Sequence, residues 1–136
     1  MVKTEFEKIN PTLDREHEKI FIAIDKVIAS INKHWKTKTK RHLIMKAFDQ
    51  LYKACDKHWK TEEKLFKKGL KKMPQSHQAV QAQIDKHRKH HIKMLNLILK
   101  IKKESQTKNP LKKIIAVKKN TIKHIKMEDV PHFHWA

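Results

Sequence analysis

The sequence predicts an all-α protein, an up-down-up-down four-helix bundle, and three observations lead to this prediction. The 136 residues include 1 Gly and 4 Pro and are rich in lysine, isoleucine, leucine and alanine, which favour helix over sheet. In three segments, inward-facing residues recur at alternating spacings of four and three, the periodicity of one helix face, and a fourth segment is also amphipathic. Short polar or proline-containing stretches separate these segments, so consecutive helices are expected to pack antiparallel. The length suits a single domain, residues 1–136.

The first helix is expected over residues 12–36. Asn10 and Pro11 precede it, and they suit an N-cap and the first helical position respectively. The helix carries an inward-facing stripe with spacings of 4, 3, 4, 3 and 4, made of His17, Phe21, Ile24, Ile28, Ile31 and Trp35.

The second helix is expected over residues 40–68, after the polar stretch 36–40. Its end is predicted at Lys67-Lys68-Gly69, because cations suit the last turn of a helix and glycine suits the position just past it. Its inward stripe consists of Ile44, Phe48, Leu51, Cys55, His58, Glu62 and Leu65.

The third and fourth helices are expected over residues 76–104 and 110–127, with the break at 105–110, SQTKNP. The fourth helix cannot continue past Pro131. The inward stripe of the third helix consists of Val80, Ile84, His87, His91, Met94, Ile98 and Ile101. That of the fourth consists of Leu111, Ile114, Ile115, Val117, Ile122, His124 and Ile125.

The chain is strongly basic, with a formal net charge of +19 that comes from 30 lysines and 3 arginines against 14 acidic residues. Such a charge attracts polyanions, and nucleic acid is the candidate partner of this kind. Two features argue against it. Arginine, which bidentate recognition of phosphate and guanine prefers, is scarce, and the lysines are scattered along every segment. The charge is therefore interpreted as a solvated surface.

The sequence indicates a cytoplasmic protein. The single cysteine, Cys55, excludes an internal disulfide and fits a reducing compartment. The N-terminal stretch contains acidic residues and lacks an apolar core, so no signal peptide is expected there. The longest apolar run, residues 20–24, is far too short to span a bilayer, so no membrane association is expected.

Each of the four inward stripes carries at least one histidine, and the second stripe also carries a glutamate. One histidine on an apolar face is usually a hydrogen-bonded core residue. Five on converging faces differ, because buried imidazoles and an ionised glutamate each cost on the order of several kcal/mol unless paired or bound to a cation. Residues four apart on a helix reach one centre. The sequence therefore predicts a metal site in the bundle core, formed by His17, His58, Glu62, His87, His91 and His124.

The other six histidines do not share this geometry; they are His34, His42, His77, His90, His132 and His134. His90 is expected to point off the third stripe. His77 lies on that stripe, but about 15 Å along the helix axis from His87, at 1.5 Å per residue. It therefore cannot join the same small centre.

Several other kinds of site are excluded or disfavoured. The chain has no Glu-x-x-His for a ferritin-like carboxylate di-iron site, no His-Glu-x-x-His for a zinc protease, and too little glycine for a phosphate-binding loop. Cys55 lies one turn before His58, but a buried core residue is favoured over a nucleophile. No general base or substrate-sized cleft is evident, so the protein is not expected to be an enzyme.

Four segments resemble, in order, the motifs of the hemerythrins and bacteriohemerythrins. They are DREHEKIF (14–21), HWKTEEKLF (58–66), HRKHHIKM (87–94) and HIKMED (124–129). The patterns are D-x-x-H-x-x-x-F, H-x-x-x-E, H-x-x-x-H and H-x-x-x-x-D, and together they cover nearly the whole chain. This resemblance implies two iron ions in an oxo- or hydroxo-bridged, non-haem centre that binds O2 reversibly, for oxygen storage, transport or sensing.

The resemblance also implies the ligands of this centre. It assigns three histidines to one iron, two to the other and two carboxylates to both: respectively His87, His91 and His124; His17 and His58; Glu62 and Asp129. One coordination position then stays open on the iron with fewer histidines, as a small diatomic ligand requires.

The chain departs from the family pattern between its second and third motifs. Glu62 and His87 are 25 residues apart, longer than is usual in the family, so helix ends or loops must absorb the extra residues. The longer segment leaves His77 as a competing match, with Gln81 at its partner position. His87 and His91 are preferred because Met94 follows them, where the family has an aromatic or apolar residue.

A second departure lies just before His124. Asn120 and Thr121 stand where the family often has Trp and Leu. Thr121 and Ile125 are expected to border the O2 pocket. A hydroxyl or a water near bound O2 would promote its protonation, so oxidation of the O2 adduct is predicted to be faster than in a dedicated oxygen carrier.

Two other functions stay open at this point. The first is a basic helical protein that associates with nucleic acid or another polyanion, and its signature is tight, steeply salt-dependent binding. The second is redox, NO or peroxide chemistry at the same di-iron site, which the sequence does not separate from O2 binding.

Overall fold

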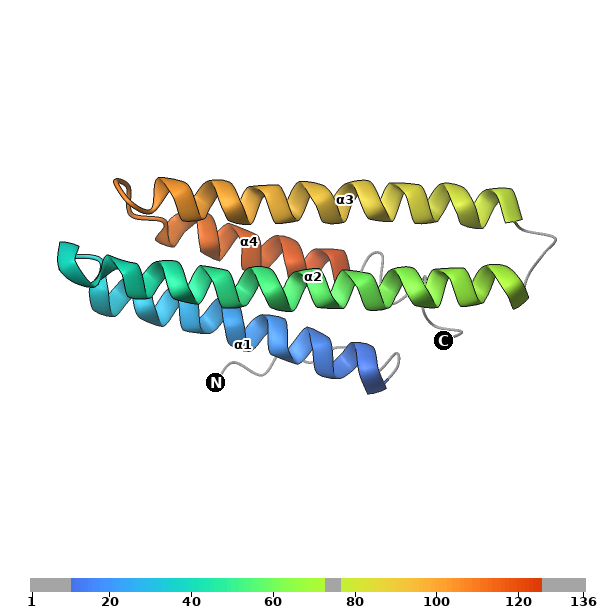
Figure 1. The fold of residues 1–136 in the computed structure, drawn as a ribbon, viewed down its shortest axis with the longest axis horizontal. Helices are drawn as coiled ribbons and strands as arrows, with labels where there is room; N and C mark the ends of the chain where they lie inside the picture. The colour runs from blue at the N-terminus through green and yellow to red at the C-terminus, as the bar shows by residue number, and fades with distance from the viewer. Residues whose placement is uncertain (1–10, 73–76, 126–136) are drawn as a thin grey trace.

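The computed structural model describes residues 11–72 and 77–125 and consists of four long helices (Figure 1). They are α1 (Pro11–His34), α2 (Arg41–Lys72), α3 (His77–Glu104) and α4 (Leu111–His124), with a short 3-10 turn, η1 (Lys38–Lys40), before α2. The described residues contain no strand. The prediction of an all-α four-helix bundle is confirmed.

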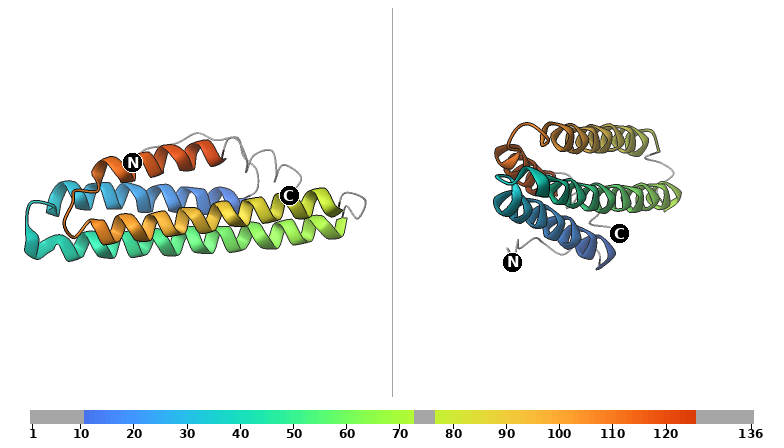
Figure 2. Two further views of the ribbon diagram at one scale, coloured as in Figure 1. Left: turned by 90° about the horizontal axis from the view of Figure 1, so that it is seen from above. Right: turned by 60° about the vertical axis from the view of Figure 1, so that its left-hand side comes forward.

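The helices form a ring in which consecutive helices run antiparallel (Figure 2). Close backbone approaches are most numerous between α1 and α2, then between α2 and α3, then between α1 and α4. They are scarcer between α3 and α4. The seam between α3 and α4 is therefore the most open side of the described bundle.

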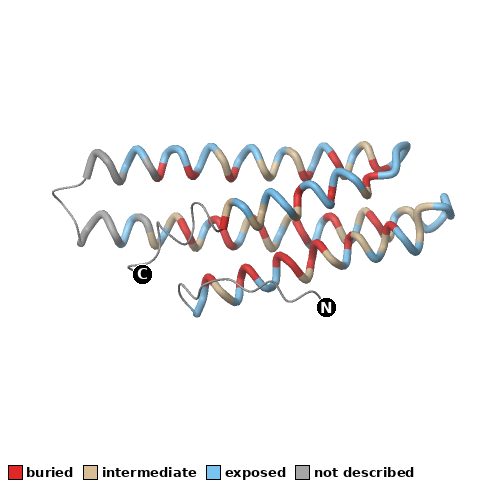
Figure 3. Tube along the Cα trace, turned by 180° about the vertical axis from the view of Figure 1, so that it is seen from behind, coloured by how far each residue is buried: buried red, intermediate tan, exposed pale blue. Residues whose placement is uncertain are grey.

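The core follows the inward stripes, so that buried residues line the facing sides of the helices while exposed residues cover the outside (Figure 3). Its largest fully buried side chains include Phe48, Leu13, Ile24, Ile31, Ile44, Leu51, Ile98 and Ile114. Burying each such side chain contributes about 1.5–3 kcal/mol. The prediction was wrong for Ile115, which is 38 % exposed, because α4 buries the face of Ile114 and Val117 instead.

The predicted end of the second helix at residue 68 was wrong. Helix α2 continues through Gly69 to Lys72, and no glycine in the described residues has a positive φ. Glycine permits the left-handed conformation of a helix cap but does not impose it, and an interior helical glycine costs only about 1 kcal/mol relative to alanine. Gly69 therefore lies inside the helix.

The long interval between Glu62 and His87 is absorbed mainly by helix. Helix α2 has 32 residues and α3 has 28, whereas α4 has 14. Both long helices extend beyond α1 and α4 on the right of Figure 1. The extra residues therefore lengthen two helices away from the histidines and leave the register of the inward stripes unchanged.

The opposite end of the bundle is held together by Arg41, at the start of α2. Its Nε donates to the carbonyl of Trp35 at 2.9 Å, and its Nη1 donates to the carbonyl of Gln106 at 3.1 Å. Its guanidinium also lies 3.7 Å from the ring centroid of Trp35. One side chain thus joins the α1–α2 turn to the α3–α4 turn.

The remaining helix ends differ little from expectation. Helix α1 ends at His34 rather than 36, and α4 begins at Leu111 rather than 110, differences within the usual spread for helix ends. The predicted N-cap, Asn10, and the predicted end of the fourth helix at 127 lie outside the described residues. Within those residues no helix has both the length and the apolarity needed to cross a bilayer.

Candidate metal centre

Each of the four helices contributes at least one predicted ligand to the same region of the core. His17 comes from α1, His58 and Glu62 from α2, His87 and His91 from α3, and His124 from α4. These residues form two groups that share Glu62, and within each group the potential ligand atoms lie within 4.8 Å of one another. One group is Glu62, His87, His91 and His124; the other is His17, His58 and Glu62.

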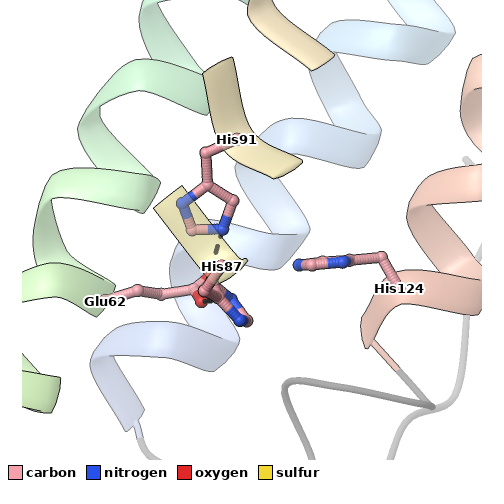
Figure 4. A group of neighbouring side chains, drawn as sticks. All are labelled: Glu62, His87, His91 and His124. Carbon is pink, nitrogen blue, oxygen red and sulfur yellow. Dashed lines mark hydrogen bonds and ion pairs between the residues drawn. The ribbon is translucent and has the colours of Figure 1, made fainter. Parts of the chain in front are cut away.

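The spacing of the ligands along each helix explains this convergence. His58 and Glu62 are four residues apart, as are His87 and His91, so each pair lies on one helix face. Figure 4 shows Glu62, His87 and His91 directed at a common space that His124 enters from the opposite side. All of these side chains are buried except His124, which is half-buried.

Glu62 divides its two carboxylate oxygens between the two histidine groups. Oε1 lies 2.5 Å from Nε2 of His58. Oε2 lies 2.6 Å from Nε2 of His87 and 3.7 Å from Nε2 of His91. Glu62 is fully buried. A carboxylate placed in this way faces two separate cation positions, one on each side.

A second buried carboxylate, Glu16, contacts His58 on the side of the ring opposite Glu62. Its Oε1 lies 3.1 Å from Nδ1 of His58, and its Oε2 accepts a hydrogen bond from the hydroxyl of Thr61 at 2.9 Å. Burial alone would raise the pKa of Glu16, but these hydrogen bonds and the charges of His58 and Lys57 outweigh burial and lower it. Glu16 is therefore an ionised acceptor.

The contact with Glu16 determines what His58 presents to the core. An ionised carboxylate only accepts hydrogen bonds, so Nδ1 of His58 carries the proton. The other ring nitrogen, Nε2, faces Oε1 of Glu62 at 2.5 Å. In the charged ring Nε2 donates to this oxygen, and in the neutral ring it offers a lone pair, so that a metal ion can be bound by Nε2 and Oε1 together. The donor set therefore fits a metal ion.

Sequence reasoning missed Glu16. It adjoins His17 and so falls one position off the predicted inward stripe of α1. The signal available was its position four residues before Ile20, which the structure also buries. The helix buries a wider face than the stripe that spacings of four and three define.

Aromatic rings pack against two of the candidate ligands. The indole of Trp59 stacks on His91, with ring centroids 4.7 Å apart and an interplanar angle of 11°. The imidazole of His90 stacks on His124 at 4.5 Å and 4°. His90 was expected to point off the stripe of α3; it nevertheless lies beside the candidate site, because α4 places His124 against it.

A small cavity adjoins the histidines, with a volume of about 20 Å³ counted as space open to the centre of a water molecule. One water needs about 10–15 Å³ by this measure, so only one or two small molecules fit. Its walls are mostly apolar, and they include Ile20, Ile24, Leu51, Ile98, Val117 and Ile125. His17, His58 and His124 also line it.

Both residues predicted to border the O2 pocket line this cavity, Thr121 and Ile125. The hydroxyl of Thr121 donates to the backbone carbonyl of Val117 at 2.8 Å. Its proton is therefore directed along the helix and not at the cavity. This geometry weighs against the expected role of Thr121 in promoting oxidation.

Cys55 lines the same cavity as a buried core residue. Burial raises the pKa of its thiol from 9.0 to about 12, and Asp56 adds to the effect. The reactive thiolate is therefore absent near neutral pH. This agrees with its interpretation as a core residue.

The structure leaves some sequence predictions outside the cluster. Asp129, assigned as the second bridging carboxylate, lies outside the described residues. His42 lies at the start of α2, where its ring is 3.0 Å from the carbonyl of Thr39. The backbone of His77 begins α3, whereas His87 and His91 are the residues of α3 that contact Glu62.

The fold and the site together define a four-helix bundle with a cluster of histidine and glutamate in its core that is suited to hold a metal ion. The family model of the Hemerythrin HHE cation binding domain matches residues 8–132, and the chain belongs to this family. The predicted resemblance is thereby confirmed. Comparison with curated proteins and with solved structures gives no match.

Proposed function

We propose that this protein binds O2 reversibly at a di-iron centre in the bundle core. The observation that carries the proposal is the division of the Glu62 oxygens between two histidine groups, beside a cavity of about 20 Å³. Two groups sharing one carboxylate suit two metal ions, and the cavity suits a diatomic ligand.

In this proposal each histidine group holds one iron. His87, His91 and His124 would hold the first iron, and His17 and His58 the second. Glu62 would contribute one oxygen to each group, and Asp129 would supply the further carboxylate that the family pattern implies. When bound, the irons would supply reversible electron transfer to O2, and His17 and His58, which line the cavity, would hold the iron beside it.

The residues around the cavity serve to keep the bound ligand from protons and water. Ile20, Ile24 and Ile125 provide apolar walls. The nearby hydroxyl of Thr121 and thiol of Cys55 do not act as acids there, since one donates to the backbone and the other is held neutral. Such surroundings favour release of O2 unchanged over its loss as a protonated species.

The size of the cavity favours binding over turnover. About 20 Å³ accommodates a diatomic molecule but no larger organic substrate beside the histidines. We therefore propose an oxygen-binding protein for storage, transport or sensing, and not an enzyme. Its basic surface is accounted for as solvated charge, because lysines occur on all four helices and nearly all described ones are exposed.

Metal analysis of purified, iron-reconstituted protein tests the site directly. We expect two irons per chain in the wild type, loss of iron from His124→Ala, and unchanged iron in His42→Ala, which alters an exposed histidine. Equal iron content in the two variants would contradict the ligand assignment. Retention of no iron by the wild type would contradict the proposal as a whole.

A further inference from the structure

The cavity beside the histidines is separated from a much larger surface cleft by a thin wall. The cleft has a volume of about 730 Å³ and lies between α3 and α4. Its lining includes Lys93, Leu97, Asn120 and Lys123. Three further residues line both the cleft and the inner cavity, namely His90, Met94 and His124.

These three shared residues differ in how freely they can move. His124 is a candidate ligand, so metal binding fixes its ring. His90 and Met94 are half-buried, have no part in the ligand set, and lie one turn apart on α3. His90 stacks on His124 and Met94 packs against the core, but neither contact is a metal bond, and side chains change rotamer faster than helices shift. His90 and Met94 are therefore the movable part of the wall.

The packing of the bundle also favours side-chain movement at the seam between α3 and α4. Close backbone approaches are numerous at the seams α1–α2, α2–α3 and α1–α4, and scarcer between α3 and α4. A side-chain movement at the α3–α4 seam therefore requires less repacking than one elsewhere among the described helices.

We propose that the α3–α4 cleft is the route by which small molecules reach the inner cavity, and that His90 and Met94 form its gate. The two side chains set the upper size of what passes. That the natural ligand is O2 rests on the proposed function, whereas the route itself does not.

Cys55 provides a reporter that needs no metal. It is the only cysteine in the chain and lines the inner cavity. Methyl methanethiosulfonate is a small neutral reagent that is nevertheless larger than the closed cavity, so it reaches Cys55 only when His90 and Met94 move aside and join the cavity to the cleft. The Cys55 sulfur attacks its sulfenyl sulfur, a new S–S bond forms, methanesulfinate leaves, and the thiol proton passes to solvent. Because burial holds the Cys55 thiol neutral, the reaction is run at about pH 9, and intact mass compares the modification rates of wild type and variants at that one pH in metal-free protein.

Opening the gate should speed this modification. We expect His90→Ala and Met94→Ala each to raise the rate about tenfold, equivalent to a barrier lower by about 1.4 kcal/mol. Two controls match them. Ile92→Ala shortens an exposed side chain of α3, and His42→Ala removes an exposed imidazole; both should leave the rate unchanged.

A bulky reagent distinguishes the gate from general unfolding. Dithiobis(nitrobenzoic acid) is too large for the cavity and reaches Cys55 only when the bundle opens. A gate variant should react faster with the small reagent and not with the bulky one, whereas a destabilised variant should react faster with both. If both gate variants match Ile92→Ala with the small reagent, or change both reagents equally, the route is wrong.

The iron-loaded protein separates this inference from the proposed function. In His90→Ala and Met94→Ala, the O2 association and dissociation rates should rise together and leave the affinity nearly unchanged. Faster Cys55 modification without O2 binding in any variant would retain the route and contradict the function. O2 binding with unchanged rates in both variants would contradict the route and retain the function.

Discussion

At the scale of single residues, the site depends on carboxylates that orient imidazoles. Glu62 faces two histidine groups, and Glu16 fixes the tautomer of His58 through Nδ1. The contact with Glu16 turns Nε2 of His58 toward the region of the core where Glu62 lies. Carboxylates that hold the far side of a ligand imidazole typically change metal affinity by about 10–100-fold when removed.

Replacing Glu16 tests its role behind His58. Glu16→Gln preserves the shape but removes the charged acceptor, so we expect about 10–100-fold weaker metal binding, measured by competition with a chelator. Glu18→Gln, a change at an exposed position of the same helix, serves as the control. If the two variants bind metal equally well, Glu16 does not position His58.

Replacing Thr121 tests whether its hydroxyl promotes oxidation. Thr121→Val keeps the shape of the side chain and removes the hydroxyl, which already donates to Val117. We expect the oxidation rate of the O2-bound protein to stay within about twofold of wild type, because a donor already bonded to the backbone contributes little elsewhere. A much slower rate would show that the hydroxyl supplies a proton, as the sequence alone suggested.

At the scale of helices, the sequence predicted the number and order of the elements well. Spacings of four and three identified the inward faces because one helix turn returns the chain to the same side. The same spacing brought together five histidines and Glu62, all of which the structure gathers. The confirmation is geometric; their roles as iron ligands stay a prediction.

Features that depend on neighbouring helices could not be predicted in this way. Glu16 is buried because α2 covers it with His58 and Thr61, and His90 adjoins the site because α4 approaches α3 beside the stripe. The cavity exists because side chains from all four helices do not completely fill the space between them. Periodicity within one helix carries no information about such contacts.

The continuation of α2 through Gly69 predicts the effect of one substitution. Gly69→Ala should raise the free energy of unfolding by about 0.5–1 kcal/mol, because alanine costs less backbone entropy in a helix. Ala82→Gly, at an exposed position of α3, should lower it by a similar amount. Denaturant unfolding measures both. A marked loss of stability in Gly69→Ala would instead indicate a left-handed helix cap at this position.

At the scale of the whole molecule, charge and function are divided between surface and interior. Described lysines are exposed except Lys102 and Lys118, which are half-buried in ion pairs with Asp49 and Asp25 across helix seams. Such pairs contribute about 0–1 kcal/mol each and add little to stability. The net charge of +19 thus belongs to the outside of the bundle, while the chemistry belongs to its histidine-lined core.

The absorption spectrum of the iron-reconstituted protein, recorded under vacuum and then under air, tests the central claim most directly. If O2 binds at two irons held by the Glu62-sharing groups, a visible charge-transfer band should appear with O2 and disappear on its removal through repeated cycles. A spectrum that does not change with O2, or that changes once and never returns, would contradict reversible binding at this site.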